Sequence, residues 1–100
     1  MIIHIVMWTL KDFAEGKDKS ENIHIMKEKL ESLIDHVDVI RKLEVGLNFN
    51  ARAAAYDIVL YSEFDSKEDL NAYQIHPEHR KVSEFIGKID DKRAVVDYEK

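Results

Sequence analysis

The first strand of this sequence carries apolar side chains on both of its faces. The run from Ile2 to Leu10 is rich in β-branched residues and is predicted to be a β-strand. Alternation along that strand places His4, Val6, Trp8 and Leu10 on one face and Ile3, Ile5 and Met7 on the other. Helices packed on the sheet can cover only one of these faces, so the other needs a second cover. A second copy of the same sheet is the simplest cover, and we predict a two-fold symmetric homodimer.

The middle of the chain predicts a helix followed by two strands. Asp18 with Glu21 three residues later is typical of a helix start, and apolar residues then recur at helical spacing as far as Val37. Apolar and polar residues alternate over residues 41–49, the period of a half-buried strand. A loop over 50–55 and another strand over 56–64 complete this part of the chain.

The last third predicts a broken helix and a closing strand. Ser66 and Asp69 form a capping pattern, and Pro77 ends that helix at His76 and restarts it in its own first turn. A strand over 93–99 follows. The order β-α-β-β-α-β is that of a ferredoxin-like α+β fold, in which helices cover one face of a four-stranded antiparallel sheet. We expect residues 1–100 to form one domain.

Charge and cysteine content narrow the classes of function. The formal net charge is −5 and the basic residues are scattered, which disfavours nucleic acid and membrane surfaces as partners. The chain has no cysteine, which excludes disulfides and thiol nucleophiles and agrees with the cytoplasm. No histidine and carboxylate spacing is typical of a metal site, so we expect no metal or other cofactor. A catalyst in this chain would be a histidine, tyrosine or carboxylate.

The densest chemistry lies between Tyr73 and His79, around the helix break. His79 falls in the first turn of the restarted helix, where the positive end of the helix dipole favours a neutral imidazole that can act as a base. Tyr73 can donate a hydrogen bond to a carbonyl or enolate oxygen. His4 and Trp8 share a face and would line an apolar cavity between sheet and helices, entered near Tyr73 and His79. His76 is interpreted as a helix-end residue beside that cavity.

Several segments of the chain together resemble the stress-responsive dimeric α/β barrel family, called Dabb. The resemblance covers nearly the whole chain. It rests on Ile3-His4-Ile5-Val6, Tyr56-Asp57-Ile58-Val59, Phe64-Asp65-Ser66, the His-Pro-x-His core of the Tyr73 to His79 segment, and Ala94-Val95-Val96-Asp97-Tyr98. It implies a homodimer in which two ferredoxin-like sheets close into a barrel with the helices outside.

The resemblance also implies site residues. The family includes a plant polyketide cyclase that closes a poly-β-keto chain by aldol condensation without a metal, and its acting tyrosine and histidine fall on Tyr73 and His79. Its pocket histidine on the first strand falls on His4, and a further pocket histidine falls on Ile58. Most members of the family have no known activity.

Three hypotheses follow for the function. The first is a small-molecule-binding protein or cofactor-free enzyme acting on an apolar or carbonyl compound, with Tyr73 and His79 as the reacting pair. The second is a non-catalytic, stress-related dimer in which the same residues are structural. The third is a cofactor-free monooxygenase, because barrels of related shape house such enzymes and Trp8 would line a hydrophobic site.

Overall fold

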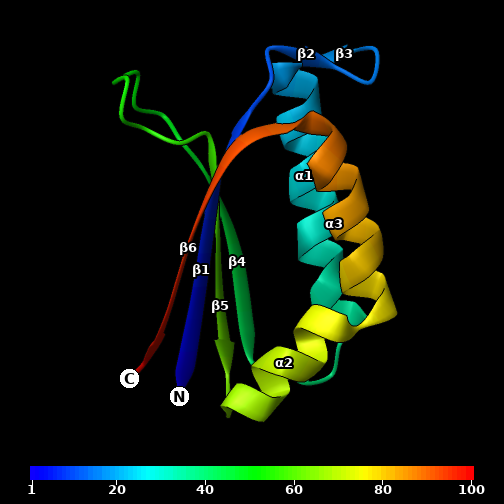
Figure 1. Ribbon diagram of the computed structural model, residues 1–100, viewed down its shortest axis with the longest axis vertical. Coiled ribbons are helices and arrows are strands. Elements are labelled where there is room, and N and C mark those ends of the chain that lie inside the picture. Colours follow the sequence, from blue (N-terminus) through cyan, green and yellow to red (C-terminus); the bar gives the residue numbers. More distant parts are fainter.

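The computed structural model describes all residues from 1 to 100 (Figure 1). Its helices are α1 (Lys19–Ser32), the short 3-10 helix η1 (Leu33–Asp35), α2 (Lys67–Ile75) and α3 (Pro77–Ile89). Its strands are β1 (Ile2–Leu10), β2 (Phe13–Ala14), β3 (Lys17–Asp18), β4 (Lys42–Leu47), β5 (Ile58–Phe64) and β6 (Asp90–Glu99). The predicted order is confirmed, and the small β2–β3 hairpin is an addition.

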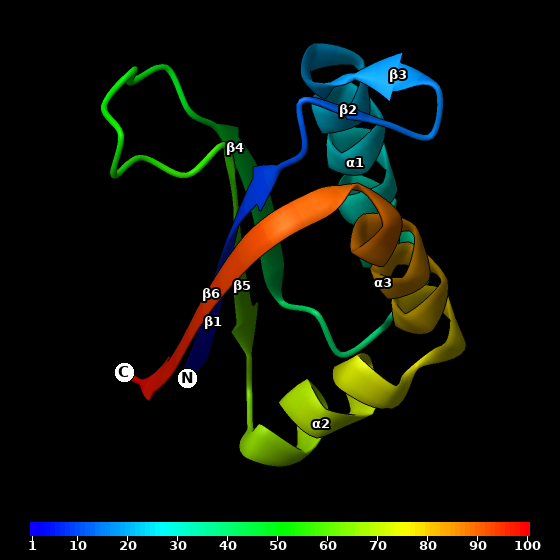
Figure 2. The ribbon, with the colours of Figure 1, turned by 45° about the horizontal axis from the view of Figure 1, so that its top comes forward.

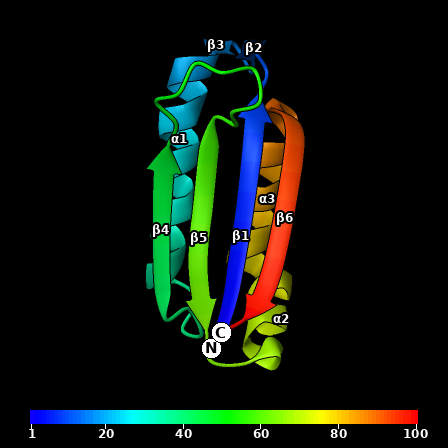
Figure 3. The same cartoon turned by 90° about the vertical axis from the view of Figure 1, so that its left-hand side faces the viewer.

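The main sheet has the strand order β4-β5-β1-β6, with every neighbouring pair antiparallel (Figure 3). The first and last strands of the chain are therefore neighbours, and β1 lies in the interior of the sheet. In this register Trp8 is opposite Ile58 on one side and Arg93 on the other, while His4 is opposite Asp97. The ferredoxin-like α+β fold is confirmed.

All the helices lie on one face of the sheet, as Figure 1 shows. The predicted inner face of β1 is buried against them, with His4, Val6, Trp8 and Leu10 each no more than 5% exposed. Met26 and Leu30 of α1 and Val82 and Ile86 of α3 belong to the same hydrophobic core. Burial of this single apolar layer is the main stabilising term of the fold.

The helix break at His76 is confirmed. His76 is extended, with a ψ of 138°, and its Nδ1 accepts a hydrogen bond from the backbone N–H of Glu78 at 3.1 Å. Pro77 occupies the start of α3, where a missing N–H costs nothing. Figure 2 shows the change of direction between α2 and α3 that results. This turn brings the end of α2 and the start of α3 over the sheet together.

Some element boundaries differ from those predicted. The first helix ends at Ser32 and tightens into η1, because the backbone N–H groups of His36 and Val37 both bond to the carbonyl of Leu33. The last strand begins three residues earlier than predicted, at Asp90, because an irregularity at Thr9 and Leu10 lets β1 continue its pairing with β6.

The face of the sheet opposite the helices is open in the single chain (Figure 3). It carries Ile5 and Met7 of β1, which are half-buried, and Val96 and Tyr98 of β6, which are 51% and 46% exposed. Tyr61 of β5 lies on the same face, with its hydroxyl 2.6 Å from Glu63. None of the helices has the length and apolar character needed to span a bilayer.

Candidate functional site

A cavity of about 330 Å³ lies between the sheet and the helices α2 and α3. Seven of its fourteen lining residues are hydrophobic, among them Val6, Trp8 and Leu60 of the sheet. Its volume is at the lower end of the range for small-molecule sites, about 300–1,000 Å³. The predicted apolar cavity is therefore present, but half of its lining is polar.

Tyr73 forms the centre of an aromatic cluster in this cavity. It sits in the last turn of α2 and its side chain is fully buried. Its ring centroid lies 4.6 Å from that of His79, 5.1 Å from Phe64 and 6.1 Å from His4. Burial raises the pKa of Tyr73, so the phenol stays protonated and able to donate.

His79 faces Tyr73 because Pro77 fixes the start of α3 two residues earlier. The side chain is half-buried, and its Nδ1 is buried without a hydrogen-bond partner. Burial lowers the pKa of His79 from its usual 6.5, and the nearby His4, Arg93 and His76 lower it further. The backbone carbonyl of Gln74 lies close enough to raise the pKa of His79 in part, although it does not meet the criteria for a hydrogen bond to Nδ1. His79 is consequently neutral at pH 7 and can accept a proton.

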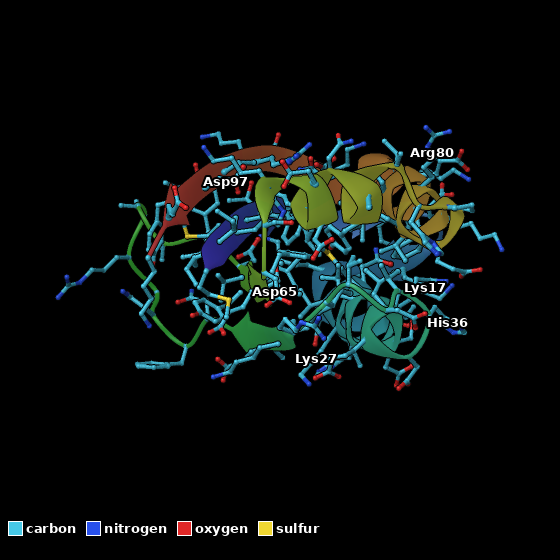
Figure 4. All side chains as sticks on the ribbon, turned by 90° about the horizontal axis from the view of Figure 1, so that it is seen from below. Lys17, Lys27, His36, Asp65, Arg80 and Asp97 are labelled. Atoms are coloured by element: carbon cyan, nitrogen blue, oxygen red, sulfur yellow. The ribbon has the colours of Figure 1, made fainter.

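His4 reaches the cavity from β1 and is tied to Asp97 of β6. The His4 Nδ1 contacts a carboxylate oxygen of Asp97, the residue opposite it in the sheet. An ionised carboxylate only accepts, so Nδ1 carries the hydrogen and Nε2 is the ring nitrogen left for a ligand. Asp97 lies at the sheet side of the molecule, far from His36 on the helix side (Figure 4).

The structure brings four of the predicted site residues together, namely Tyr73, His79, His4 and Trp8. Ile58 and His76 do not line this cavity. Ile58 lies on β5, on the side of β1 away from β6, and borders a separate hollow of about 410 Å³ beneath the 48–57 loop. Nδ1 of His76 accepts a hydrogen bond at the start of α3, which agrees with its interpretation as a helix-end residue.

The mouth of the cavity extends further along α3 than predicted. Its exposed lining residues are Gln74 beside Tyr73, Ser83 and Gly87 on α3, and Arg93 on β6. A Cβ added at Gly87 would meet no atom within 4 Å, so this glycine leaves the mouth wide. Sequence reasoning missed Arg93 and Asp97, because their relation to Tyr73 and His79 depends on strand register. It also missed Ser83 and Gly87, although their spacing of four and eight residues from His79 on one helix was a signal that could have found them.

No group of three histidine, cysteine or acidic side chains in the structure is arranged to hold a metal ion. A neutral imidazole, a protonated phenol and a carboxylate-bound imidazole meet in one partly apolar space, an arrangement suited to moving a proton at a bound small molecule.

Comparison with known proteins gives a family match and several relatives. The model of the family described as "Stress responsive A/B Barrel Domain" matches residues 2–100. A stress-response A/B barrel domain-containing protein of Arabidopsis thaliana is 31% identical over 98% of this chain. That match covers 36% of the relative, so the chain spans about a third of the curated protein's length.

Solved structures share the fold over almost the whole chain. A dimeric protein of unknown function with a ferredoxin-like fold from Bacteroides fragilis is 39% identical, with a TM-score of 0.87 over 99% of this chain and 95% of that one. A hydroxynitrile lyase from Passiflora edulis is 19% identical, with a TM-score of 0.79 over 97% and 90% of the two chains. The latter likeness concerns the fold alone.

Proposed function

This chain belongs to the stress-responsive A/B barrel domain family, and from that premise we propose that its cavity binds a small carbonyl compound and removes a proton from the carbon beside the carbonyl. One observation carries the proposal. Tyr73 and His79 line the same cavity with their rings in edge-to-face contact, and burial lowers the pKa of His79 so that its imidazole is neutral. A base and a hydrogen-bond donor are the two groups that enolate formation requires.

In the proposed step His79 accepts the proton from the carbon atom, and the electron pair of the broken C–H bond moves onto the carbonyl oxygen. Tyr73 donates a hydrogen bond to that oxygen as its negative charge develops. The enolate can then be reprotonated by His79. Alternatively, its carbon can attack a second carbonyl, whose π electrons move onto the oxygen, and that oxygen takes the proton back from His79. The buried Trp8, Leu60 and Val6 keep water away and strengthen the hydrogen bond from Tyr73.

The resemblance to a polyketide cyclase with a tyrosine and histidine pair at these positions supports the same assignment. The occurrence of a hydroxynitrile lyase on this fold supports the use of the architecture for small-molecule chemistry. His4 is proposed as a second polar contact, which offers Nε2 to the ligand while Asp97 holds the ring in place.

Hydrogen–deuterium exchange tests the proposal directly. Acetophenone in D2O loses its methyl proton signal by NMR when a base removes those protons, and the protein should accelerate that loss above the buffer rate. Tyr73→Phe and His79→Gln should each slow the protein-dependent exchange by about 100-fold. His24→Gln, at an exposed histidine of α1, is the matched control and should leave the rate unchanged. An unchanged rate in His79→Gln would overturn the role of His79.

A non-catalytic ligand-binding dimer is the second candidate, favoured by the packing of Tyr73 against Phe64 and His4. In that case Tyr73→Phe and His79→Gln would change the melting temperature and leave exchange at the buffer rate in every variant. The wild-type exchange rate therefore separates the two functions.

We also propose that two copies pack their open sheet faces together. The apolar side chains of that face and the dimeric state named for the Bacteroides fragilis protein support this arrangement. The cavity lies on the opposite face of each sheet, so each copy would keep its own Tyr73 and His79.

A further inference from the structure

We propose that the ligand carries a carboxylate at the end that faces the mouth of the cavity, and that Arg93 binds this carboxylate. The inference rests on the proposed function and names its substrate class, a keto acid whose carbonyl reaches Tyr73 and His79. Three features of the structure point to it: the place of Arg93 in the sheet, its lack of an ion-pair partner, and the residues that line the mouth.

Arg93 is aimed at the cavity by the register of β6. It is opposite Trp8 of β1, and Val95 and Asp97 follow on the same, helix-facing side of the strand. The side chain lines the cavity and is otherwise exposed. The positive charge of Arg93 acts on the cavity, because it is one of the charges that lower the pKa of His79.

No carboxylate of the chain lies within ion-pair distance of Arg93, although Arg41 on the other edge of the sheet pairs with Asp65 at 2.7 Å. A guanidinium presents a planar fork of donors that matches a carboxylate in two parallel hydrogen bonds. An unpaired guanidinium at the rim of a cavity whose buried lining is largely apolar is suited to an amphipathic ligand. The carboxylate would stay at the rim while the remainder is buried.

Asp90 and Gly87 define what kind of anion fits. Asp90 also lines the cavity and adds one negative charge near the mouth, which favours a singly charged carboxylate over a doubly charged phosphate ester. Gly87 and Arg93 both line the cavity, and a Cβ added at Gly87 would meet no atom within 4 Å. A chain can therefore pass from Arg93 inward to the aromatic cluster.

The test compares 3-benzoylpropionate, an aromatic keto acid, with its uncharged methyl ester by calorimetric titration of the full chain. The wild-type protein should bind the acid about tenfold more tightly than the ester. Arg93→Gln should weaken binding of the acid about tenfold and leave binding of the ester unchanged. Asp90→Asn should strengthen binding of the acid.

Lys92→Gln is the matched control, since it removes the same charge from the neighbouring residue of β6, which is exposed and faces the other side of the sheet. Equal binding of acid and ester by the wild type, or an equal loss in Lys92→Gln and Arg93→Gln, would overturn the role of Arg93. Acetophenone has no carboxylate for Arg93 to bind, so the wild-type protein should accelerate its exchange whether or not Arg93 binds the carboxylate of a keto acid. Failure of this inference and failure of the proposed function are therefore told apart.

Discussion

Asp97 of β6 accepts a hydrogen bond from Nδ1 of His4, its opposite residue on β1. The imidazole is almost completely buried, and the carboxylate is partly open to solvent. The pair therefore fixes the ring of a cavity residue from outside the cavity. This is the arrangement by which a neighbouring carboxylate sets the tautomer and orientation of a functional histidine.

Replacing Asp97 should show how much this pairing contributes to stability. Asp97→Ala leaves the buried Nδ1 of His4 without a partner and should lower the free energy of unfolding by about 1–3 kcal/mol. Asp97→Asn keeps a carbonyl oxygen that can accept from Nδ1 and should cost less. Urea denaturation of the three proteins measures the difference, and equal stability of Asp97→Ala and the wild type would contradict the pairing.

The depressed pKa of His79 predicts that acid destabilises the folded chain. The unfolded chain takes up a proton near pH 6.5, whereas the folded chain resists it, so the unfolded state binds more protons in that range. The contribution of His79 is complete above about pH 6.5 and is lost as the pH falls from there toward the lowered pKa. His79→Gln should show a flatter dependence of stability on pH below 6.5 than the wild type.

The exchange rate of acetophenone should depend on pH through the protonation of His79. Protonated His79 cannot accept a proton from carbon, so the rate should fall as the pH drops through the lowered pKa of His79. An NMR titration of the imidazole protons gives the midpoint independently. A rate midpoint at or above 6.5 would show that another group acts as the base.

Gly87 should be exchangeable for alanine with a gain in stability. Glycine is a poor helix former, and an added Cβ meets nothing within 4 Å. Gly87→Ala should therefore raise the free energy of unfolding by about 1 kcal/mol, measured by urea denaturation, while binding of 3-benzoylpropionate persists. Gly87→Leu should narrow the mouth and weaken that binding. Undiminished binding by Gly87→Leu would place the mouth elsewhere.

The proposed dimer can be tested with two neighbouring valines. Val96 lies on the open face of the sheet, and Val95 on the helix-facing side, with similar exposed fractions of 51% and 46%. Val96→Lys buries a charge between the two sheets and should yield monomers in sedimentation experiments. Val95→Lys should leave the mass of the dimer unchanged. The same mass for both variants would rule out the open face as the interface.

The fold was predictable because its signals are local. The capping pair Asp18 and Glu21, the break at Pro77 and the alternation along the strands can each be recognised in a few consecutive residues. Tyr73 and His79 were predictable as a pair for the same reason, since they are six positions apart with one helix break between them. The boundary at Asp90 differed because it depends on pairing between β1 and β6, whereas the end of α1 at Ser32 differed because the next turn tightens through local bonds to the carbonyl of Leu33.

The rest of the site depends on register between distant parts of the chain. Arg93 lines the cavity and Asp97 holds His4 because β6 pairs with β1 with His4 opposite Asp97, and no short motif encodes that offset. Ile58 was assigned to the pocket by the resemblance, yet Leu60 is the residue of β5 that lines the space near Tyr73, and Ile58 borders the separate hollow beneath the 48–57 loop. The alternation of side chains along the strands predicts which face of the sheet meets the helices. The packing of the helices determines where on that face the cavity lies.

The neighbouring positions of β1 and β6 also bring the two ends of the chain side by side (Figure 3). The backbone N–H of Lys100 donates to the carbonyl of Met1 at 2.8 Å. A short linker could therefore join the ends, and the chain could be reopened in the exposed loop at residues 50–54 with every pairing of the main sheet retained. Such a circular permutant would move the new termini to the opposite end of the sheet, so that labels or fused domains could be attached there.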